Sequence, residues 1–553
     1  MSQEKYVIGI DYGTLSGRAL LVRVSDGHEV ASAVHEYKHG VLEETLPSSG
    51  KKLPPDWALQ VPSDYVDVLK ETIPKVLKES GIDPKEVVGV ATDFTACTVL
   101  PVMEDGVPIC ELPEFSDEPH AYVKLWKHHS AQPHADRINS IANSRGEKWI
   151  SRYGGKISSE WEFAKALELL EENPKIYNSM RYWIEAADWI VWQLCGTYVR
   201  NICTAGYKGI YQDGSYPSTD YLASLNPNFV NFVTDKLDHK FGELGSKAGL
   251  LTEEASKWTG LPAGIAVAVG NVDAHVTAAA ANAVSSGQMV AIMGTSTCHI
   301  MVADRLAEVT GMCGVVDGGI VSGKLGYEAG QSGVGDIFGW FANNYIPPEY
   351  HEEAKRAGID LHTYLSDLAA KQRVGAHGLV ALDWQSGNRS TLVDHKLSGL
   401  IIGMTLSTKP EEIYRAIVES TAFGTKKIVD TFNDSGVNVK EFIAAGGLIK
   451  NRFVMQIYAD VLNMPISIIS SPQGPALGSA IHAAVAAGEY KDVVEASKFM
   501  GGRESNSYLP NKENAAVYEK LYKHYCKLYE YFGHNEIMHD LRGIRDQALK
   551  QET

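Results

Sequence analysis

The stretch YVIGIDYGTLSGR, residues 6–18, decides the fold of this chain. Its first half reads as a buried strand that ends at Asp11, and a turn rich in glycine, serine and threonine follows at once. Such a turn lets backbone N–H groups and short hydroxyls approach a phosphate, while a carboxylate at the strand end can hold a Mg²⁺-bound water. The stretch therefore indicates a candidate triphosphate site, although Asp11 could also be an ordinary turn-forming aspartate.

A second stretch of the same kind, QMVAIMGTSTCHIMV, occupies residues 288–302. It reads as an apolar strand, a turn at Gly294, Thr295 and Ser296, and another apolar strand. Two such units indicate a duplicated α/β fold that places two phosphate-binding turns on opposite walls of one cleft. That arrangement suits a nucleotide that is gripped from both sides as the cleft closes.

The chain of 553 residues is too long for one core, so we expect two domains. Composition shifts at AAAANAVSSG, residues 278–287, where a small-residue helix gives way to serine and glycine. We place the boundary there, which gives domains at 1–284 and 285–553. The content of 44% hydrophobic and 22% charged residues is that of an ordinary globular protein.

The chain is acidic, with 51 Lys and Arg against 68 Asp and Glu and a formal charge of −17. This disfavours a nucleic-acid partner but not one small anionic ligand. The seven cysteines form no CxxC pair, which favours a reduced, cytoplasmic setting. The first residues have no signal-peptide pattern, and no run of about 18 apolar residues predicts a membrane span.

Hydrophobic periodicity and turn residues predict mixed α/β elements in both halves. In the first 110 residues we expect strands over 6–10, 19–24, 29–36 and 87–93, a helix over 64–80, and a hairpin of 98–103 with 107–109. In the second half we expect strands over 289–293, 298–302, 441–445 and 466–469, helices over 411–433, 451–462 and 476–487, and a tail helix over 514–550.

Residues 120–245 are predicted to be mostly helical. A capping box from Ser159 to Glu162 should begin a helix over 163–172, and a second helix should run over 177–195. The tryptophans of that second helix are expected in the core, with a ligand pocket as the alternative. The histidines of the chain lack a metal-ligand spacing, so they predict no metal centre.

Asp273 is the leading candidate for a catalytic base. It lies in GNVDAH, residues 270–275, between an apolar strand over 266–269 and an alanine-rich helix. A carboxylate at such a junction can point into a cleft and accept a hydroxyl proton during phosphoryl transfer. The alternative is a helix N-cap, a position that favours Asp.

Four segments carry a family resemblance: DYGTLSGR, GNVDAH, MGTSTCH and AAGGLIKN. Together, from about residue 6 to about residue 490, they resemble the FGGY carbohydrate kinases. That family shares the duplicated ribonuclease-H-like fold of actin, hexokinase and the heat-shock chaperones. The resemblance implies this actin-like ATPase fold, with two domains flanking a central cleft.

Within the family, TDFTACT, LWKHHSAQ, YKGIY and YEAGQS are most similar to the members that phosphorylate ribulose. Many other members carry Trp-x-Asp-x-Arg near the position of Trp126. Here Trp126, Lys127, His128 and His129 stand instead, so the sugar contacts of that Asp and Arg are not transferred.

The resemblance implies roles for single residues. Asp273 would be the general base, and Asp11 would hold Mg²⁺ through water. Arg18 would contact phosphate, or it would only form a surface ion pair. Three further alternatives stay open. Lys208 could be an ordinary exposed lysine, Glu328 could be a structural ion-pair partner, and Gly446–Gly447 could be a plain turn. The implied phosphate contacts are Gly13, Thr14, Ser16, Arg18, Gly294, Thr295 and Ser296; the implied adenine-side contacts are Gly446, Gly447 and Asn451; and the implied sugar contacts are the Ala96 N–H, Lys208, Asp273 and Glu328.

The implied activity is ATP- and Mg²⁺-dependent phosphorylation of the 5-hydroxyl of L-ribulose, a step of arabinose catabolism. Two alternatives stay open: a kinase for another pentulose or polyol, and an ATP-driven conformational protein without a sugar acceptor. The expected partners are the ketopentose and ATP, without nucleic acid or membrane. The oligomeric state is open, a homo-oligomer being one alternative.

Overall fold

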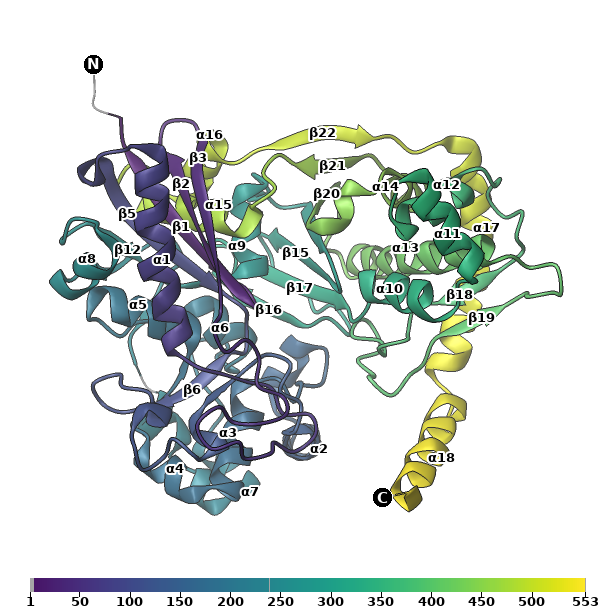
Figure 1. Cartoon of the computed structure of the whole chain (residues 1–553). Coiled ribbons are helices and arrows are strands. Elements are labelled where there is room, and N and C mark those ends of the chain that lie inside the picture. Colours follow the sequence, from purple (N-terminus) through teal and green to yellow (C-terminus); the bar gives the residue numbers. More distant parts are fainter. Residues whose placement is uncertain (1–3, 238, 553) are drawn as a thin grey trace.

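The computed structural model describes residues 4–237 and 239–552, and in it the chain forms two halves that are each built on a seven-stranded sheet (Figure 1). The first sheet has the order β11-β12-β5-β1-β2-β3, with β13 also paired to β5, and the second has the order β16-β17-β15-β14-β20-β21-β22. Their strands are β1 (Tyr6–Tyr12), β2 (Ser16–Arg23), β3 (Glu29–Glu36), β5 (Val87–Phe94), β11 (Lys247–Leu250), β12 (Ala266–Ala268) and β13 (Asn271–Val272), and β14 (Gln288–Met293), β15 (Thr297–Ala303), β16 (Gly314–Asp317), β17 (Leu325–Gln331), β20 (Glu441–Ala445), β21 (Ile466–Ile469) and β22 (Arg503–Tyr508).

The two sheets repeat one pattern, as the duplicated sequence units predict. In the first, β1 pairs antiparallel with β2 and parallel with β5. In the second, β14 pairs antiparallel with β15 and parallel with β20. The turn within each central hairpin is one of the two predicted phosphate turns, so both turns have the same position in their sheets.

Helices cover the faces of the first sheet, which explains why β1 is one continuous apolar run. Helix α1 (Ser63–Ser80) contacts β2 and β3, and α15 (Gly474–Ala486) contacts β1 and β5. A Cβ on Gly9 of β1 would lie 1.9 Å from the carbonyl oxygen of Ala476, so only glycine allows this approach of helix to strand.

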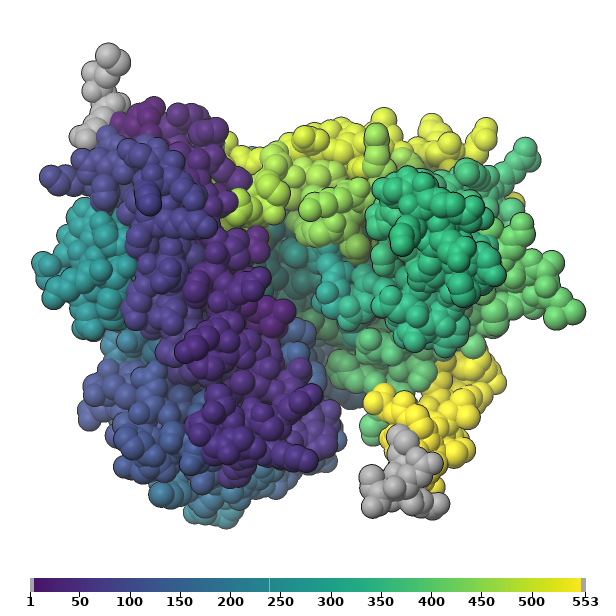
Figure 2. Space-filling model, viewed as in Figure 1, coloured from purple at the N-terminus to yellow at the C-terminus, as the bar shows by residue number. Residues whose placement is uncertain are grey.

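Helix α15 comes late in the sequence but packs against the first sheet. The hydroxyl of Ser479 donates to Asp93 Oδ2 at 2.6 Å, and Tyr490 donates to the carbonyl of Val24 at 2.7 Å. The space-filling view shows this late segment directly against the N-terminal strands (Figure 2). The division at residue 284 stays a prediction, and a cut there would separate α15 from the sheet it covers.

The segment between β5 and β12, together with β4 and its neighbours from before β5, forms a separate core with its own four-stranded sheet, of order β4-β7-β6-β8. Its elements are β4 (Leu59–Gln60), β6 (Val99–Val102), β7 (Val123–Lys124), β8 (Tyr182–Glu185), β9 (Arg200–Asn201), β10 (Phe241–Gly242), α2 (Gln132–Arg145), α3 (Glu162–Glu172), α4 (Pro174–Ser179), α5 (Ala186–Cys195), α6 (Ile202–Tyr207), α7 (Thr219–Leu225) and α8 (Glu253–Thr259).

Three expectations for this region are wrong. The helix predicted over 177–195 is interrupted by strand β8, because its residues 182–185 pair with β6 and complete the small sheet. The predicted capping box is absent: Trp161 is the N-cap of α3, and the carboxylate of Glu162 is buried against Arg200 at 2.8 Å. Residues 107–109 form only a bridge to Val102 and not a strand.

The second half packs its helices around the second sheet. They are α10 (Gly335–Asn344), α11 (Pro348–Ala357), α12 (Leu361–Ala370), α13 (Pro410–Asp434), α14 (Arg452–Leu462), α16 (Val493–Met500), α17 (Lys512–Gly533) and α18 (Ile537–Glu552), with a small hairpin of β18 (Val380–Leu382) and β19 (Leu400–Ile402). Helix α9 (Asp273–Ala280) ends the first half and contacts α15 and strand β15. The predicted single tail helix is wrong, because the chain forms α17 and then α18. Tyr518 and Tyr525 of α17 are buried in the second core, whereas α18 extends from the body (Figure 1). No helix in the described residues is long and apolar enough to cross a membrane.

Candidate active site

Each predicted phosphate turn is closed by a hydrogen bond from its glycine to a serine. The N–H of Gly13 donates to the carbonyl of Ser16 at 3.0 Å, and the N–H of Gly294 donates to the carbonyl of Ser296 at 2.9 Å. The first turn is one residue longer than the second, so the two turns share their place in each sheet but not their exact local geometry.

Contacts from neighbouring elements fix each turn. Trp126 Nε1 donates to Thr14 Oγ1 at 3.1 Å, and Gln60 Nε2 donates to the Thr14 carbonyl at 2.7 Å. On the other side, the N–H groups of Val334 and Gly335, at the start of α10, donate to the carbonyls of Thr295 and Gly294 at 2.8 and 3.0 Å. Each turn is thus held in place before any ligand contacts it.

Asp11 is the last but one residue of β1, so it is a strand residue and not the turn former of the alternative interpretation. Its register neighbours are Arg18 on β2 and Asp93 on β5. Arg18 Nε lies 3.4 Å from Asp11 Oδ2. Burial raises the pKa of Asp11, and the charge of Arg18 acts in the opposite direction.

Asp93 is a buried carboxylate that the sequence analysis did not single out. Burial first, and then the charge of Asp11, raise its pKa well above the ordinary value. Oδ2 accepts from Ser479, while the buried Oδ1 has no hydrogen-bond partner. The signal in the sequence was a charged residue at the end of a buried apolar strand, in the segment TDFTACT.

Asp273 is the first residue of α9, and Val272 occupies the N-cap position. The N-cap alternative for Asp273 is therefore wrong. Burial and the charge of Asp11 raise the pKa of Asp273 to about 7, although the N–H of Ala274 opposes the shift. A carboxylate that titrates near neutral pH can be ionised before reaction and can accept a proton during it.

Lys208 and Glu328 form a buried ion pair between the two halves. Lys208 follows α6 and is 3% exposed, so the alternative of an ordinary exposed lysine is wrong. Its Nζ lies 3.1 Å from Glu328 Oε2 on β17. Burial opposes ionisation of both groups, but their mutual attraction raises the pKa of Lys208 and, with His275, holds that of Glu328 well below its usual range.

Glu328 has two further partners that the sequence analysis missed. Arg389 donates to its Oε1 at 2.8 Å, and His275 Nε2 lies 3.1 Å from its Oε2. His275 was counted among scattered histidines, yet it lies two residues after Asp273 on α9. Arg389 had no motif that could have indicated it, because its loop reaches Glu328 only through the tertiary fold.

Ala96 lies in the half-buried turn that follows β5. Thr95 and Thr98 close this turn through a 2.8 Å contact between their hydroxyl oxygens. The next residue, Cys97, has a φ of 60°, which is rare for a residue with a side chain. The same turn is electrostatically coupled to Lys208, so the structure brings Ala96, Lys208 and Glu328 into one region.

The Gly446–Gly447 turn packs against the end of β14. Gly446 has a φ of 88°, and a Cβ there would lie 2.5 Å from the carbonyl oxygen of Met293, the residue before Gly294. The predicted adenine-side turn thus adjoins the second phosphate turn. Asn451 instead caps α14: its side-chain oxygen accepts from Phe453 and Val454, and its amide donates to Ser366.

The described residues contain no group of three or more His, Cys, Asp or Glu side chains arranged to hold a metal ion. Several buried histidines each contact a single carboxylate. His128, for example, is buried 3.2 Å from Glu168, and burial lowers its pKa to about 3.

Comparison with known families and proteins gives matches in both halves of the chain. The FGGY family of carbohydrate kinases matches twice, by its N-terminal domain over residues 6–280 and by its C-terminal domain over residues 289–487. A ribulokinase of Mycolicibacterium smegmatis is 61% identical over 99% of this chain and 98% of its own, and a ribulokinase of Bacillus licheniformis is 53% identical over 98% and 99%.

Solved structures agree on the fold. A xylulose kinase from Rhodospirillum rubrum superposes with a TM-score of 0.78 at 23% identity, covering 96% of this chain and all of its own. A Plasmodium falciparum glycerol kinase with ADP gives a TM-score of 0.71 at 16% identity over 95% and 98%. The actin-like, ribonuclease-H-like fold is therefore confirmed. With family matches over both halves, this chain belongs to the FGGY family of carbohydrate kinases, enzymes that use ATP.

Proposed function

We propose that this enzyme transfers the γ-phosphoryl group of ATP to the 5-hydroxyl of L-ribulose, giving L-ribulose 5-phosphate and ADP. The observation that carries the reaction is the half-buried carboxylate of Asp273, with its pKa raised to about 7 and with Asp11, Lys208 and Glu328 as electrostatic neighbours. The choice of ribulose rests on the identity with the ribulokinases over nearly the whole chain.

In this proposal Asp273 accepts the proton of the 5-hydroxyl as that oxygen attacks the γ-phosphorus. The new O–P bond forms while the bond to the β-phosphate oxygen breaks, and ADP leaves with that electron pair. Backbone donors of the two glycine turns stabilise the charge of the phosphoryl group in the transition state. The phosphate contacts are Gly13, Thr14, Ser16, Arg18, Gly294, Thr295 and Ser296.

Asp11 fits a role beside Mg²⁺. Its carboxylate is 13% exposed at the end of β1 and lies between the guanidinium of Arg18 and the buried Asp93. Asp11 therefore offers carboxylate oxygens to a metal but does not by itself form a full set of metal ligands. This suits an ion bound mainly by phosphate oxygens and water, with Asp11 holding one of those waters. When bound, Mg²⁺ would neutralise charge on the phosphates.

The sugar lies near the N–H of Ala96, Lys208, Asp273 and Glu328 in this assignment. An open-chain ketose carries hydroxyls that donate and accept, and an ammonium, carboxylates and a backbone N–H meet both needs. The adenine lies against Gly446 and Gly447, while Asn451 supports that wall as a helix cap. Closure of the halves would exclude water and limit ATP hydrolysis. We place the enzyme in the cytoplasm, in keeping with its unpaired cysteines.

A sugar panel with a coupled ADP assay tests the proposal. L-ribulose should give the highest kcat/KM among L-ribulose, D-ribulose, xylulose and glycerol, and ³¹P NMR should place the phosphate on carbon 5 of the product. A large preference for xylulose or glycerol would mean that the enzyme is an FGGY kinase for that compound and not for L-ribulose. ATPase activity that does not depend on sugar and survives Asp273→Asn would instead indicate a conformational ATPase.

A further inference from the structure

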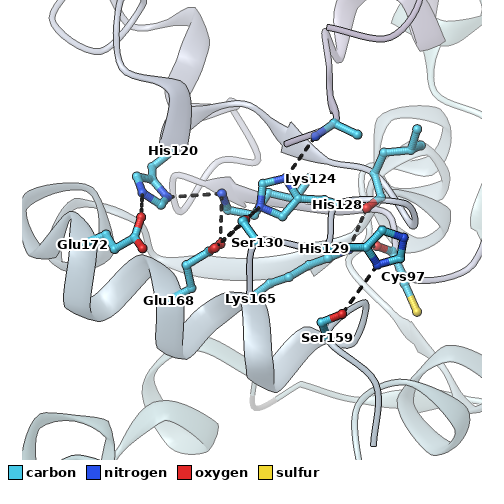
Figure 3. A network of polar contacts seen from close by, with 12 residues as sticks. Cys97, His120, Lys124, His128, His129, Ser130, Ser159, Lys165, Glu168 and Glu172 are labelled. Carbon is cyan, nitrogen blue, oxygen red and sulfur yellow. Dashed lines mark hydrogen bonds and ion pairs between the residues drawn. The ribbon is translucent and has the colours of Figure 1, made fainter. Parts of the chain in front are cut away.

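Lys165 of α3 is a fully buried lysine whose ammonium joins two separate segments of the chain. Its Nζ donates to the carbonyl of Cys97 at 2.6 Å and to the carbonyl of Leu125 at 2.7 Å. Figure 3 shows the Lys165 side chain running from α3 toward Cys97. The two carbonyls lie on separate segments, and Lys165 connects them through one charged group.

This arrangement is costly for the folded protein. Among the described residues no carboxylate lies within ion-pair distance of Lys165 Nζ, and burial lowers its pKa to about 8. A buried ammonium without an ion-pair partner opposes folding, and an apolar side chain of similar size would avoid that cost. The Lys165 ammonium therefore indicates a role other than core packing.

The first of the two segments is the Ala96 turn. Cys97 has a φ of 60°, a strained conformation for a residue with a side chain, which persists where surrounding contacts enforce it. The bond from Lys165 to the Cys97 carbonyl is such a contact. It fixes the orientation of the peptide between Cys97 and Thr98. That peptide lies two units after the one that carries the Ala96 N–H, so the bond restrains the turn proposed to contact the sugar.

The second segment connects to the phosphate turn. Leu125 is followed by Trp126, whose Nε1 donates to Thr14 Oγ1 at 3.1 Å. Helix α3 also contacts the loop of Lys208, since the N–H of Glu162 donates to the Lys208 carbonyl at 3.3 Å. One helix thus contacts the Ala96 turn, the Trp126 segment and the Lys208 loop.

We propose that Lys165 is a positioning residue that holds the Ala96 turn and the Trp126 segment in the geometry required for binding the ketopentose. The proposal rests on the proposed function, in which the Ala96 N–H contacts the sugar. Lys165 does not contact substrate itself; it acts through the carbonyls of Cys97 and Leu125.

A neighbouring lysine provides a matched control. Lys124 is also fully buried, but its Nζ lies 3.1 Å from His120 Nδ1, 3.6 Å from Glu168 Oε2 and 4.3 Å from the centre of the Trp57 ring. Figure 3 shows Lys124 with His120 and Glu168, apart from the contact between Lys165 and Cys97. Loss of the Lys124 ammonium should destabilise the same core without releasing the Ala96 turn.

The test compares Lys165→Met with Lys124→Met and the wild-type enzyme. The quantities measured are KM for L-ribulose, KM for ATP, kcat and Tm. We expect Lys165→Met to raise KM for L-ribulose at least tenfold and KM for ATP by a smaller factor, because the Trp126 segment also contacts Thr14 of the phosphate turn. Lys124→Met should lower Tm with both KM values within twofold of wild type.

Three outcomes would overturn the proposal: a lower Tm of Lys165→Met with unchanged KM for L-ribulose, an equal KM rise in Lys124→Met, or an equal rise in KM for ATP. If Lys165→Met does not fold, Lys165→Gln is judged by the same criteria. If neither Lys165 variant folds while Lys124→Met does, Lys165 is needed for folding and the proposal is contradicted. Failure of the proposed function is separate, because the wild-type enzyme itself would then not phosphorylate L-ribulose.

Discussion

The ammonium of Lys208 lies 3.1 Å from the carboxylate of Glu328, and this buried pair joins the two halves of the molecule at the candidate sugar site. Lys208 comes from the segment between β5 and β12, and Glu328 from the strand beside the second phosphate turn. The contact therefore links the relative position of the halves to the groups proposed to bind sugar.

The ion pair predicts a strong response to Lys208→Met. Removing one partner of an isolated buried pair costs about 3–5 kcal/mol. Glu328 keeps Arg389 and His275 as partners, so we expect a loss below that range. We expect a lower Tm and a fall of kcat/KM for L-ribulose of at least tenfold. The double variant Lys208→Met/Glu328→Gln should lose less than the sum of the two single variants, because both remove the same contact. Additive losses in Tm and kcat/KM would show that the pair is not coupled.

The pKa of Asp273 predicts the acid limb of the pH profile. Burial and Asp11 raise this pKa to about 7, and only the ionised carboxylate can accept a proton. As the pH falls below about 7, Asp273 becomes protonated, so log kcat/KM for L-ribulose should fall with a slope near one per pH unit. The dissociation constant of ADP, measured over the same range, controls for loss of nucleotide binding. A flat profile from pH 8 to pH 5 would contradict the assignment of the base.

Gly446 predicts an effect specific to the nucleotide. A Cβ at this residue would lie 2.5 Å from the Met293 carbonyl, directly before the second phosphate turn, and its φ is 88°. Gly446→Ala should therefore displace that turn and raise KM for ATP, while KM for L-ribulose stays within twofold. Gly436→Ala is the control, since Gly436 has a φ of 85° but open space around its Cβ position. Equal kinetics of the two variants would mean that the close packing at Gly446 is unimportant for ATP.

Much of the fold could be predicted because local signals agreed with the tertiary structure. The strands around Asp11 and Gly294 are continuous apolar runs with glycine turns, and both formed as expected. The prediction failed where distant partners decided the structure. Trp183 sits in a segment with helical periodicity, yet pairing with β6 makes it a strand residue. Glu162 matches a capping motif, but Arg200 takes its carboxylate.

The site was predictable to the extent that its residues stand in motifs. Asp11, Asp273 and Gly294 lie in short segments of distinctive composition. Arg389 and Lys165 do not, because their roles arise only when Glu328 or the Cys97 carbonyl is brought to them by folding. A single charged residue in a loop or a helix carries no local pattern that would mark it.

The most direct test of the central claim is the turnover of Asp273→Asn with L-ribulose and ATP. A general base contributes about 10²–10⁴-fold to a rate, so kcat should fall by that factor while the dissociation constant of ADP stays within twofold. Tm at pH 8 should not decrease, because the amide replaces a carboxylate whose raised pKa shows that burial disfavours its charged form. A loss of turnover with intact ADP binding is the predicted result, and a kcat within threefold of wild type would contradict the account.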